Sequence, residues 1–316
     1  MDVVSQYHSF FNNNTGNEHD FRLFRYTDSI YLGEDKIGNA VIVCISTKPN
    51  RSPVLQRTQV LSIECNMKVK YVVEGKEESD TVHIIRCLSQ SQKEKDIFIE
   101  LSSLFIEACR QEDQVSALLD TVSILSSFFT NKKEPSDIEL QGLFAELLTI
   151  KRFHNSLRLG DYWHTNDRMN FDFSITEKIK IEVKSTVNKE RKHHFKHEQL
   201  AYETYDIYVV SYMLKSDDEG TSLYDLIIST KPLIANDPRR IMILNKYLKN
   251  TSESRLKQCR FNEQLAISNC RFYYAREIPR FSEQAPIGLT NAEYDCNLEN
   301  ANSINEEKFT EEIILR

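Results

Sequence analysis

The strongest constraint in the sequence is the stretch at 170–186, which reads NFDFSITEKIKIEVKST and alternates apolar with polar side chains. Successive side chains of a β-strand point to opposite faces of a sheet, so residues 170–175 and 179–186 are predicted to form two strands. Asp172 lies on the polar face of the first strand. The polar face of the second strand carries Lys180, Glu182, Lys184 and Thr186.

A turn over residues 176–178 would join the strands as a hairpin and place Asp172 and Glu182 on one face. Neighbouring carboxylates repel each other and favour their neutral forms unless a cation lies between them. Mg²⁺, or else Mn²⁺, is the expected cation because it prefers oxygen ligands, and Lys184 adds a positive charge beside it. This set suits phosphodiester hydrolysis, in which the metal activates a water that the lysine orients. The alternative is a solvated strand face with a Glu–Lys pair.

A further carboxylate lies in the helix predicted to begin after Ser136 and to end near Phe153. Ser136 and Glu139 have the spacing of a capping box, which places the helix start there. Apolar residues occupy nearly every face, as in a buried helix, yet Glu146 lies among them. A buried carboxylate is costly unless it is paired or coordinated, so Glu146 is a candidate site residue.

The hydrophobic periodicity along the chain predicts a mixed α/β protein, α+β overall. Short alternating runs between 21 and 87 indicate an antiparallel sheet, and helical spacing follows over 92–129. Beyond the strand pair we expect a helix near 195–205, a strand over 206–214 and strands over 266–278. The expected organisation is a β-rich N-terminal domain at 1–112, a bridging helix and joint at 113–134, a core at 135–250, and C-terminal strands with a polar tail at 251–316.

Three motifs resemble those of one nuclease superfamily. GLFAELL at 142–148, NFDF at 170–173 and IEVKST at 181–186 look like the helix Glu, the strand Asp and the E-x-K of PD-(D/E)XK nucleases. More narrowly, the chain is similar to the bacterial "PD-(D/E)XK motif protein" family, whose members carry a β-rich N-terminal part and are encoded within restriction or phage-defence loci. Two departures stand out: Asn170-Phe171 replaces the proline that often precedes the Asp, and no QxxxY follows the E-x-K.

The resemblance implies a restriction-endonuclease-like core, with a central mixed sheet flanked by helices. It implies metal binding by Asp172 and Glu182, assisted by the Val183 carbonyl and by Glu146. Gln199, in the helix predicted after the strands, would approach the site as a similar glutamine does in some superfamily members. The expected catalytic residues are Glu146, Asp172, Glu182, Lys184 and Gln199.

Basic residues concentrate around the second strand and the turn after it. Residues 176–197 contain seven Lys or Arg against three acidic residues, which suits either contact with phosphates or an ordinary charged turn; the position beside the candidate site supports the phosphate contact. His193, His194 and His197 lack a fourth ligand of suitable spacing, so we expect no zinc site there. The sole tryptophan, Trp163, is expected in the core or at a domain contact. The predicted nucleic-acid contacts are Lys180, Thr186, Lys189, Arg191, Lys192 and Lys196.

The leading functional hypothesis is a Mg²⁺-dependent DNA endonuclease of a restriction or phage-defence system, with a methyltransferase or ATPase as expected partners and a homodimer as an option. The alternative is a nuclease-fold subunit that binds DNA or a partner and is active only in a complex, or inactive. The N-terminal domain could read DNA, hold a partner or dimerise. Without a signal-like start or a long apolar window, the chain is expected to be cytoplasmic and away from membranes, with reduced core cysteines.

Overall fold

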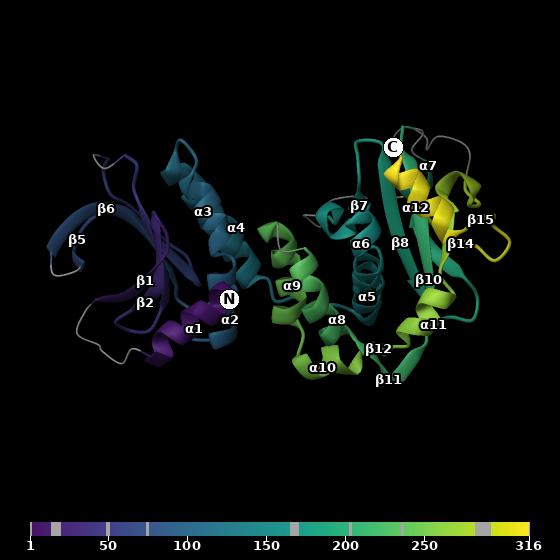
Figure 1. Ribbon diagram of the computed structural model, residues 1–316, viewed down its shortest axis with the longest axis horizontal. Coiled ribbons are helices and arrows are strands. Elements are labelled where there is room, and N and C mark those ends of the chain that lie inside the picture. Colours follow the sequence, from purple (N-terminus) through teal and green to yellow (C-terminus); the bar gives the residue numbers. More distant parts are fainter. Residues whose placement is uncertain are drawn as a thin grey trace. The chain divides into compact units, whose positions relative to one another are not determined.

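The computed structural model in Figure 1 describes a chain that divides into two compact units, Met1–Lys133 and Glu134–Arg316. The predicted fold class is confirmed: a β-rich N-terminal part precedes a core in which a mixed sheet is flanked by helices. No helix among the described residues is long and apolar enough to cross a membrane. The described residues are 2–13, 20–48, 51–73, 76–164, 171–201, 204–234, 237–281 and 292–315.

The first unit is built on an antiparallel sheet with strand order β1-β2-β3-β6-β5-β4. Its helices α2 and α4 contact strands β3 and β5, and α3 packs on α4. The segment expected to bridge two domains therefore lies, as α4, against the first sheet. The strands are β1 (Phe21–Thr27), β2 (Ile30–Asp35), β3 (Ala40–Ile45), β4 (Val54–Arg57), β5 (Leu61–Val73) and β6 (Lys76–Cys87), and the helices are α1 (Val3–Asn13), α2 (Gln92–Glu100), α3 (Ser102–Cys109) and α4 (Gln114–Thr130).

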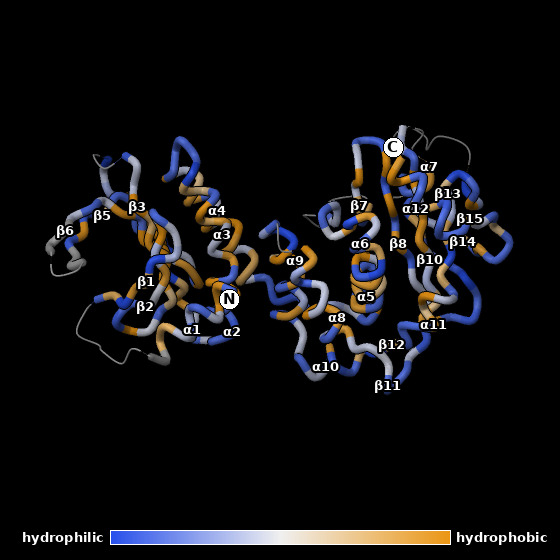
Figure 2. Tube along the Cα trace, viewed as in Figure 1, coloured by the Kyte–Doolittle hydropathy of each residue, from blue (hydrophilic) through white to orange (hydrophobic). Residues whose placement is uncertain are grey.

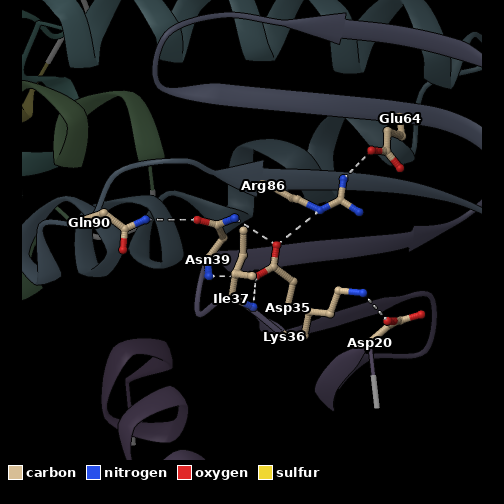
Figure 3. A network of polar contacts seen from close by, with 8 residues as sticks. All are labelled: Asp20, Asp35, Lys36, Ile37, Asn39, Glu64, Arg86 and Gln90. Atoms are coloured by element: carbon tan, nitrogen blue, oxygen red, sulfur yellow. Dashed lines mark hydrogen bonds and ion pairs between the residues drawn. The ribbon is translucent and has the colours of Figure 1, made fainter. Parts of the chain in front are cut away.

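A polar network joins three strands of the first unit through one guanidinium group. Figure 3 shows Arg86 of β6 between two carboxylates: its Nη1 lies 2.7 Å from Glu64 of β5 and its Nε lies 3.6 Å from Asp35 at the end of β2. Asp35 also accepts hydrogen bonds from the backbone N–H and the side-chain amide of Asn39. The carboxylate thus fixes the turn from β2 to β3 while it partners the arginine.

The second unit contains the sheet β15-β13-β10-β8-β7, in which β8 and β10 are parallel and the other neighbours are antiparallel. A small sheet pairs β14 with β9, and another pairs β11 with β12. The strands are β7 (Phe173–Ser174), β8 (Ile179–Thr186), β9 (Lys192–Lys196), β10 (Asp206–Met213), β11 (Ser216–Ser222), β12 (Arg260–Phe261), β13 (Arg271–Tyr274), β14 (Glu293–Asn297) and β15 (Ser303–Ile304).

Helix α5 packs against β8 and begins at the predicted capping box, with Ser136 and Glu139 bonded in both directions. Figure 2 colours most of α5 as hydrophobic, in keeping with its buried leucines. The helical elements are α5 (Asp137–Arg152), α6 (His154–Leu157), η1 (Leu159–Tyr162), α7 (Glu198–Ala201), α8 (Leu223–Thr230), η2 (Lys231–Leu233), α9 (Pro238–Asn250), α10 (Glu253–Gln258), α11 (Glu263–Ser268), η3 (Ala275–Glu277) and α12 (Glu306–Ile314).

The structure differs from two local predictions. Where a helix was expected near 195–205, strand β9 runs first, because His193 and Phe195 alternate inward with exposed neighbours, and only the short α7 follows. Where strands were expected over 266–278, the helix α11 comes first, because Asn262 caps its N-terminus. The C-terminal part also contains α12, whose Phe309 and Ile313 are buried.

We predict that Arg86→Ala lowers the free energy of unfolding of the first unit by about 1–3 kcal/mol, since Asp35 and Glu64 would lose the cation that offsets their partial burial. Urea unfolding followed by far-UV circular dichroism measures this. Arg25→Ala is the matched control. The Arg25 side chain is 61% exposed, so its removal should change the free energy of unfolding by less than about 0.5 kcal/mol. Equal midpoints for the two variants would contradict the role of the network.

Candidate active site

The two strands predicted within residues 170–186 form the β7–β8 hairpin. Phe173 pairs with Ile181 and Ser174 with Lys180, which places Asp172 opposite Glu182 one step further along. Asp172 is fixed there because its Oδ2 accepts a hydrogen bond from the backbone N–H of Val183 at 2.7 Å. Within NFDF, Asn170 falls outside the described residues.

Glu182 is the centre of the polar contacts on this face. Its side chain is only 5% exposed, and its Oε1 lies 2.7 Å from Lys184 Nζ and accepts a hydrogen bond from Gln199 Nε2 at 2.6 Å. Gln199, on α7, in turn accepts hydrogen bonds from Lys184 Nζ at 3.0 Å and from the backbone N–H of Lys196 at 3.1 Å. The second oxygen, Glu182 Oε2, is buried and has no hydrogen-bond partner among the described residues.

Glu146 reaches the site from α5 and is held by residues just before β7. Its Oε2 accepts a hydrogen bond from Trp163 Nε1 at 2.7 Å and lies 3.5 Å from His164 Nε2. Trp163 forms a bridge with Phe173, and the backbone N–H of His164 donates to the carbonyl of Asp172 at 2.9 Å. The same two residues therefore fix Glu146 and the backbone that carries Asp172.

The pKa values of all three carboxyl groups are raised above their ordinary values. Burial raises the pKa of Asp172 well above its usual range, and the charges of Glu182 and Glu146 raise it further. Burial also raises the pKa of Glu182, although Lys184 opposes this shift. For Glu146, burial and the charge of Glu182 outweigh the Trp163 hydrogen bond and bring the pKa to about 7. A positive charge placed among these groups would relieve all three shifts.

The donor set suits a hard divalent cation, because carboxylate oxygens converge here and Glu182 Oε2 has no partner in the part of the chain that the structure describes. Within the described residues, however, no three His, Cys, Asp or Glu side chains are already arranged around one metal position. Asp172 and Glu182 face each other across the hairpin, whereas Glu146 approaches from α5 and accepts a hydrogen bond from Trp163 at its Oε2.

Two of the predicted nucleic-acid contacts lie in the protein interior. Arg191 is 2% exposed, and its Nη1 donates to the Ser211 carbonyl and hydroxyl at 2.8 and 2.7 Å, while Nη2 donates to the Asn269 carbonyl. Thr186 is also buried, and its hydroxyl accepts from the backbone N–H of Asn188. For both residues the prediction was wrong, because the chain folds back from β8 into β9 and turns these side chains inward.

The four predicted lysines remain near the surface. Lys189, Lys192 and Lys196 are exposed, and Lys192 forms an ion pair with Asp295 at 3.1 Å. Lys180 is partly exposed and donates to the Thr176 carbonyl at 2.9 Å.

The histidines occupy different environments, which argues against a shared zinc ion. His193 is buried against the Ser211 hydroxyl at 2.7 Å, and burial lowers its pKa to about 3. The neighbouring His194 points to the opposite face of β9, toward Glu293 and Asp295. Adjacent residues of a strand cannot bind one ion together from opposite faces.

The family comparison agrees with this geometry. A family model described as "Putative PD-(D/E)XK family member, (DUF4420)" matches residues 11–299. The chain belongs to this family. No curated protein and no solved structure matches it.

The predicted superfamily is therefore confirmed, and PD-(D/E)XK membership indicates nuclease-type hydrolase chemistry. Asp172, Glu182 and Lys184, which the sequence resemblance assigned to the Asp and E-x-K of the motif, lie close together in the structure.

Sequence reasoning missed the roles of Trp163 and His164 in this PD-(D/E)XK site. Trp163 is buried as expected, but its N–H points to Glu146. A sequence signal was available: an amphipathic aromatic pair lies shortly before the motif Asp, and a helix carries one buried carboxylate in need of a donor.

We predict that the metal-free protein loses stability as the pH rises from about 4.5 through about 7. The pKa of Glu146 is raised in the folded state, so the native protein binds the proton more tightly and is favoured at low pH. The raised pKa values of Asp172 and Glu182 act in the same direction, and Lys184 opposes them. In Glu146→Gln, the free energy of unfolding lost over this pH range should be smaller than in the wild type by about 1–3 kcal/mol.

Urea unfolding in EDTA, followed by Trp163 fluorescence at several pH values, measures the effect. Glu307→Gln is the control because Glu307 lies exposed on α12. If the free energy of unfolding falls by the same amount in Glu146→Gln and in the wild type, burial and neighbouring charge do not raise the pKa of Glu146 as described.

Proposed function

We propose that the chain is a divalent-metal-dependent endonuclease that hydrolyses phosphodiester bonds of DNA. The observation that carries the proposal is the group formed by Asp172, Glu182 and Lys184. It has two opposed carboxylates with raised pKa values, one buried oxygen without a hydrogen-bond partner among the described residues, and an ammonium group 2.7 Å from Glu182. Like charges held close together away from water destabilise the folded state, so this group is costly unless it binds a ligand. Its chemistry suits a cation and a phosphate.

In this proposal Asp172 and Glu182 would hold Mg²⁺, or Mn²⁺, with the Val183 carbonyl as a further ligand. The bound ion would supply a water of lowered pKa and would offset charge on the phosphate. Lys184 is oriented by Glu182 and Gln199, so its ammonium group can direct the water or stabilise negative charge that develops on the phosphate. Glu146, with a pKa near 7, can accept or return a proton close to neutral pH.

The four surface lysines support the choice of nucleic acid as substrate. Lys180 lies on β8 itself, and Lys189, Lys192 and Lys196 follow within the turn and β9. Lysines so close to the carboxylates can bind phosphates on either side of the cleavage point and draw a polyanion toward an overall acidic protein. A restriction or phage-defence context, with a methyltransferase or ATPase partner, belongs to the proposal through the family resemblance alone.

One observation favours a second candidate, a nuclease that becomes active only within a complex. Glu182 Oε1 is occupied by Lys184 and Gln199, and the described side chains do not yet surround a metal position. An enzyme that completes its site on binding DNA or a partner would show this arrangement at rest. Cleavage that appears only after neighbouring gene products are added would identify this version.

We predict that the purified protein cleaves DNA with Mg²⁺ or Mn²⁺ and not with EDTA. Asp172→Asn, Glu182→Gln and Lys184→Ala should each lower the cleavage rate at least about 100-fold, because each removes a charge that acts in the transition state. Gel analysis of labelled duplex and single-stranded DNA measures this. Lys257→Ala, a half-exposed lysine on α10, serves as the control. Equal cleavage by wild type, Asp172→Asn and Lys184→Ala would refute the assignment.

Metal binding can be tested without any activity. Mg²⁺ at about 10 to 100 times its Kd should stabilise the wild type by about 1.4–2.7 kcal/mol at pH 7.5, where the site carboxylates are most costly. Glu182→Gln should abolish most of that gain, and Glu307→Gln should keep it. Thermal unfolding followed by Trp163 fluorescence measures the shift. A gain that Glu182→Gln leaves intact would place the metal elsewhere.

A further inference from the structure

A cavity of about 280 Å³ lies beside the catalytic face of the second unit. It opens where β10 begins and β13 ends, and η3 contacts both α7 and β10 there. The residues that matter to the argument are Leu200, Tyr205, Asp206, Tyr274, Arg276 and Arg280.

The cavity is connected to the catalytic carboxylates through Tyr205. The Tyr205 ring packs edge-on against Phe171, the residue before Asp172, with centroids 5.9 Å apart. On its other side, Lys180 Nζ lies 5.2 Å from the centre of the same ring. Lys180 precedes Glu182 by two residues on the same face of β8, a distance of roughly 7 Å along a strand. A strand of nucleic acid at Glu182 would therefore pass close to the cavity.

The floor and rim of the cavity differ in chemistry. Tyr205 and Tyr274 supply aromatic surface, which accepts the face of any nucleobase. Arg276 and Arg280 are exposed at the rim: the Arg276 guanidinium lies 4.5 Å from the Tyr274 ring centre, and Arg280 Nη1 donates to the Ala275 carbonyl at 3.1 Å. Arginines anchored in this way suit a phosphate. Asp206 provides a carboxylate of the kind that accepts hydrogen bonds from a base amino group.

We propose that this cavity binds one unpaired nucleotide, with its base against Tyr205 and Tyr274 and its phosphate at Arg276 and Arg280. The volume lies at the lower end of the range for small-ligand sites and is too small for a base pair. The inference rests on the proposed nuclease function and specifies its substrate: nucleic acid with an unpaired or extruded nucleotide beside the cleavage point. The nucleotide could belong to the bound strand or be a free mononucleotide, since the recognised groups are the same.

The test uses the full chain carrying Lys184→Ala, so that bound DNA stays intact. Fluorescence anisotropy compares two labelled duplexes of equal length, one fully paired and one with a single bulged nucleotide. We expect the bulged duplex to bind about tenfold more tightly, the effect of one base stacked on an aromatic side chain. Competition by free dAMP forms a further arm: displacement of the bulged duplex, or binding of dAMP by itself, shows that a free mononucleotide also enters the site.

Substitutions at the cavity decide whether the preference arises there. Arg276→Ala with Arg280→Ala should abolish the preference and reduce the slope of log Kd against log salt by about 0.7 to 1.4. Arg239→Ala, an exposed arginine at the start of α9, should change neither. Tyr205→Leu should lose the preference, whereas Tyr205→Phe should retain it, because only the phenylalanine keeps an aromatic face. Unfolding midpoints followed by Trp163 fluorescence verify that each variant is folded.

Equal binding of both duplexes without any binding of dAMP would overturn the proposal, as would a preference that survives the double arginine substitution. These outcomes are distinct from failure of the nuclease proposal. If the wild type cleaves DNA but shows no preference for the bulged duplex, the proposed nucleotide site is refuted and the nuclease proposal still stands. A bulge preference in a protein that never cleaves DNA would support the nucleotide site and refute the proposed catalysis.

Discussion

The repulsion among three carboxylates, one buried and two half-buried, is the constraint on which the second unit depends, and one lysine eases it. Asp172 and Glu182 face each other across a hairpin, and Glu146 approaches from α5. Burial makes each charge expensive, so the surrounding structure is arranged to supply donors: the backbone N–H of Val183, the ammonium of Lys184, and the amide of Gln199. In the proposed function, a bound cation and the substrate would offset this cost.

These donors come from separate layers of the unit, and the site exists only where the layers meet. Helix α5 and the segment with Trp163 and His164 support the site from one side, while α7 brings Gln199 from the other. Interior residues such as Arg191 and His193 fasten β9 to Ser211 of β10, next to the strand that bears Lys184. Arg191 and His193 therefore serve the fold, whereas Lys189, Lys192 and Lys196 stay exposed.

Sequence reasoning reached the parts of this arrangement that depend on local periodicity. Alternation predicted the hairpin, capping chemistry predicted the start of α5, and the odd polar residue of a buried helix predicted Glu146. It failed where tertiary packing reverses a local preference: a basic stretch looked like an exposed turn, but β9 folds back and buries Arg191. It also missed the bond between Trp163 and Glu146: the sequence shows an aromatic donor and a carboxylate that needs one, but local periodicity does not pair two residues seventeen positions apart.

The pairing of β9 with β14 has a consequence for biosynthesis. Lys192–Lys196 pair with Glu293–Asn297, about a hundred residues further along the chain. The β9 segment carries the Lys196 N–H that orients Gln199, so this partnership of distant strands helps to complete the environment of Lys184. Contacts so remote in sequence form late, after most of the chain has left the ribosome. A nascent chain would therefore carry the E-x-K motif without its finished surroundings until β14 has been synthesised.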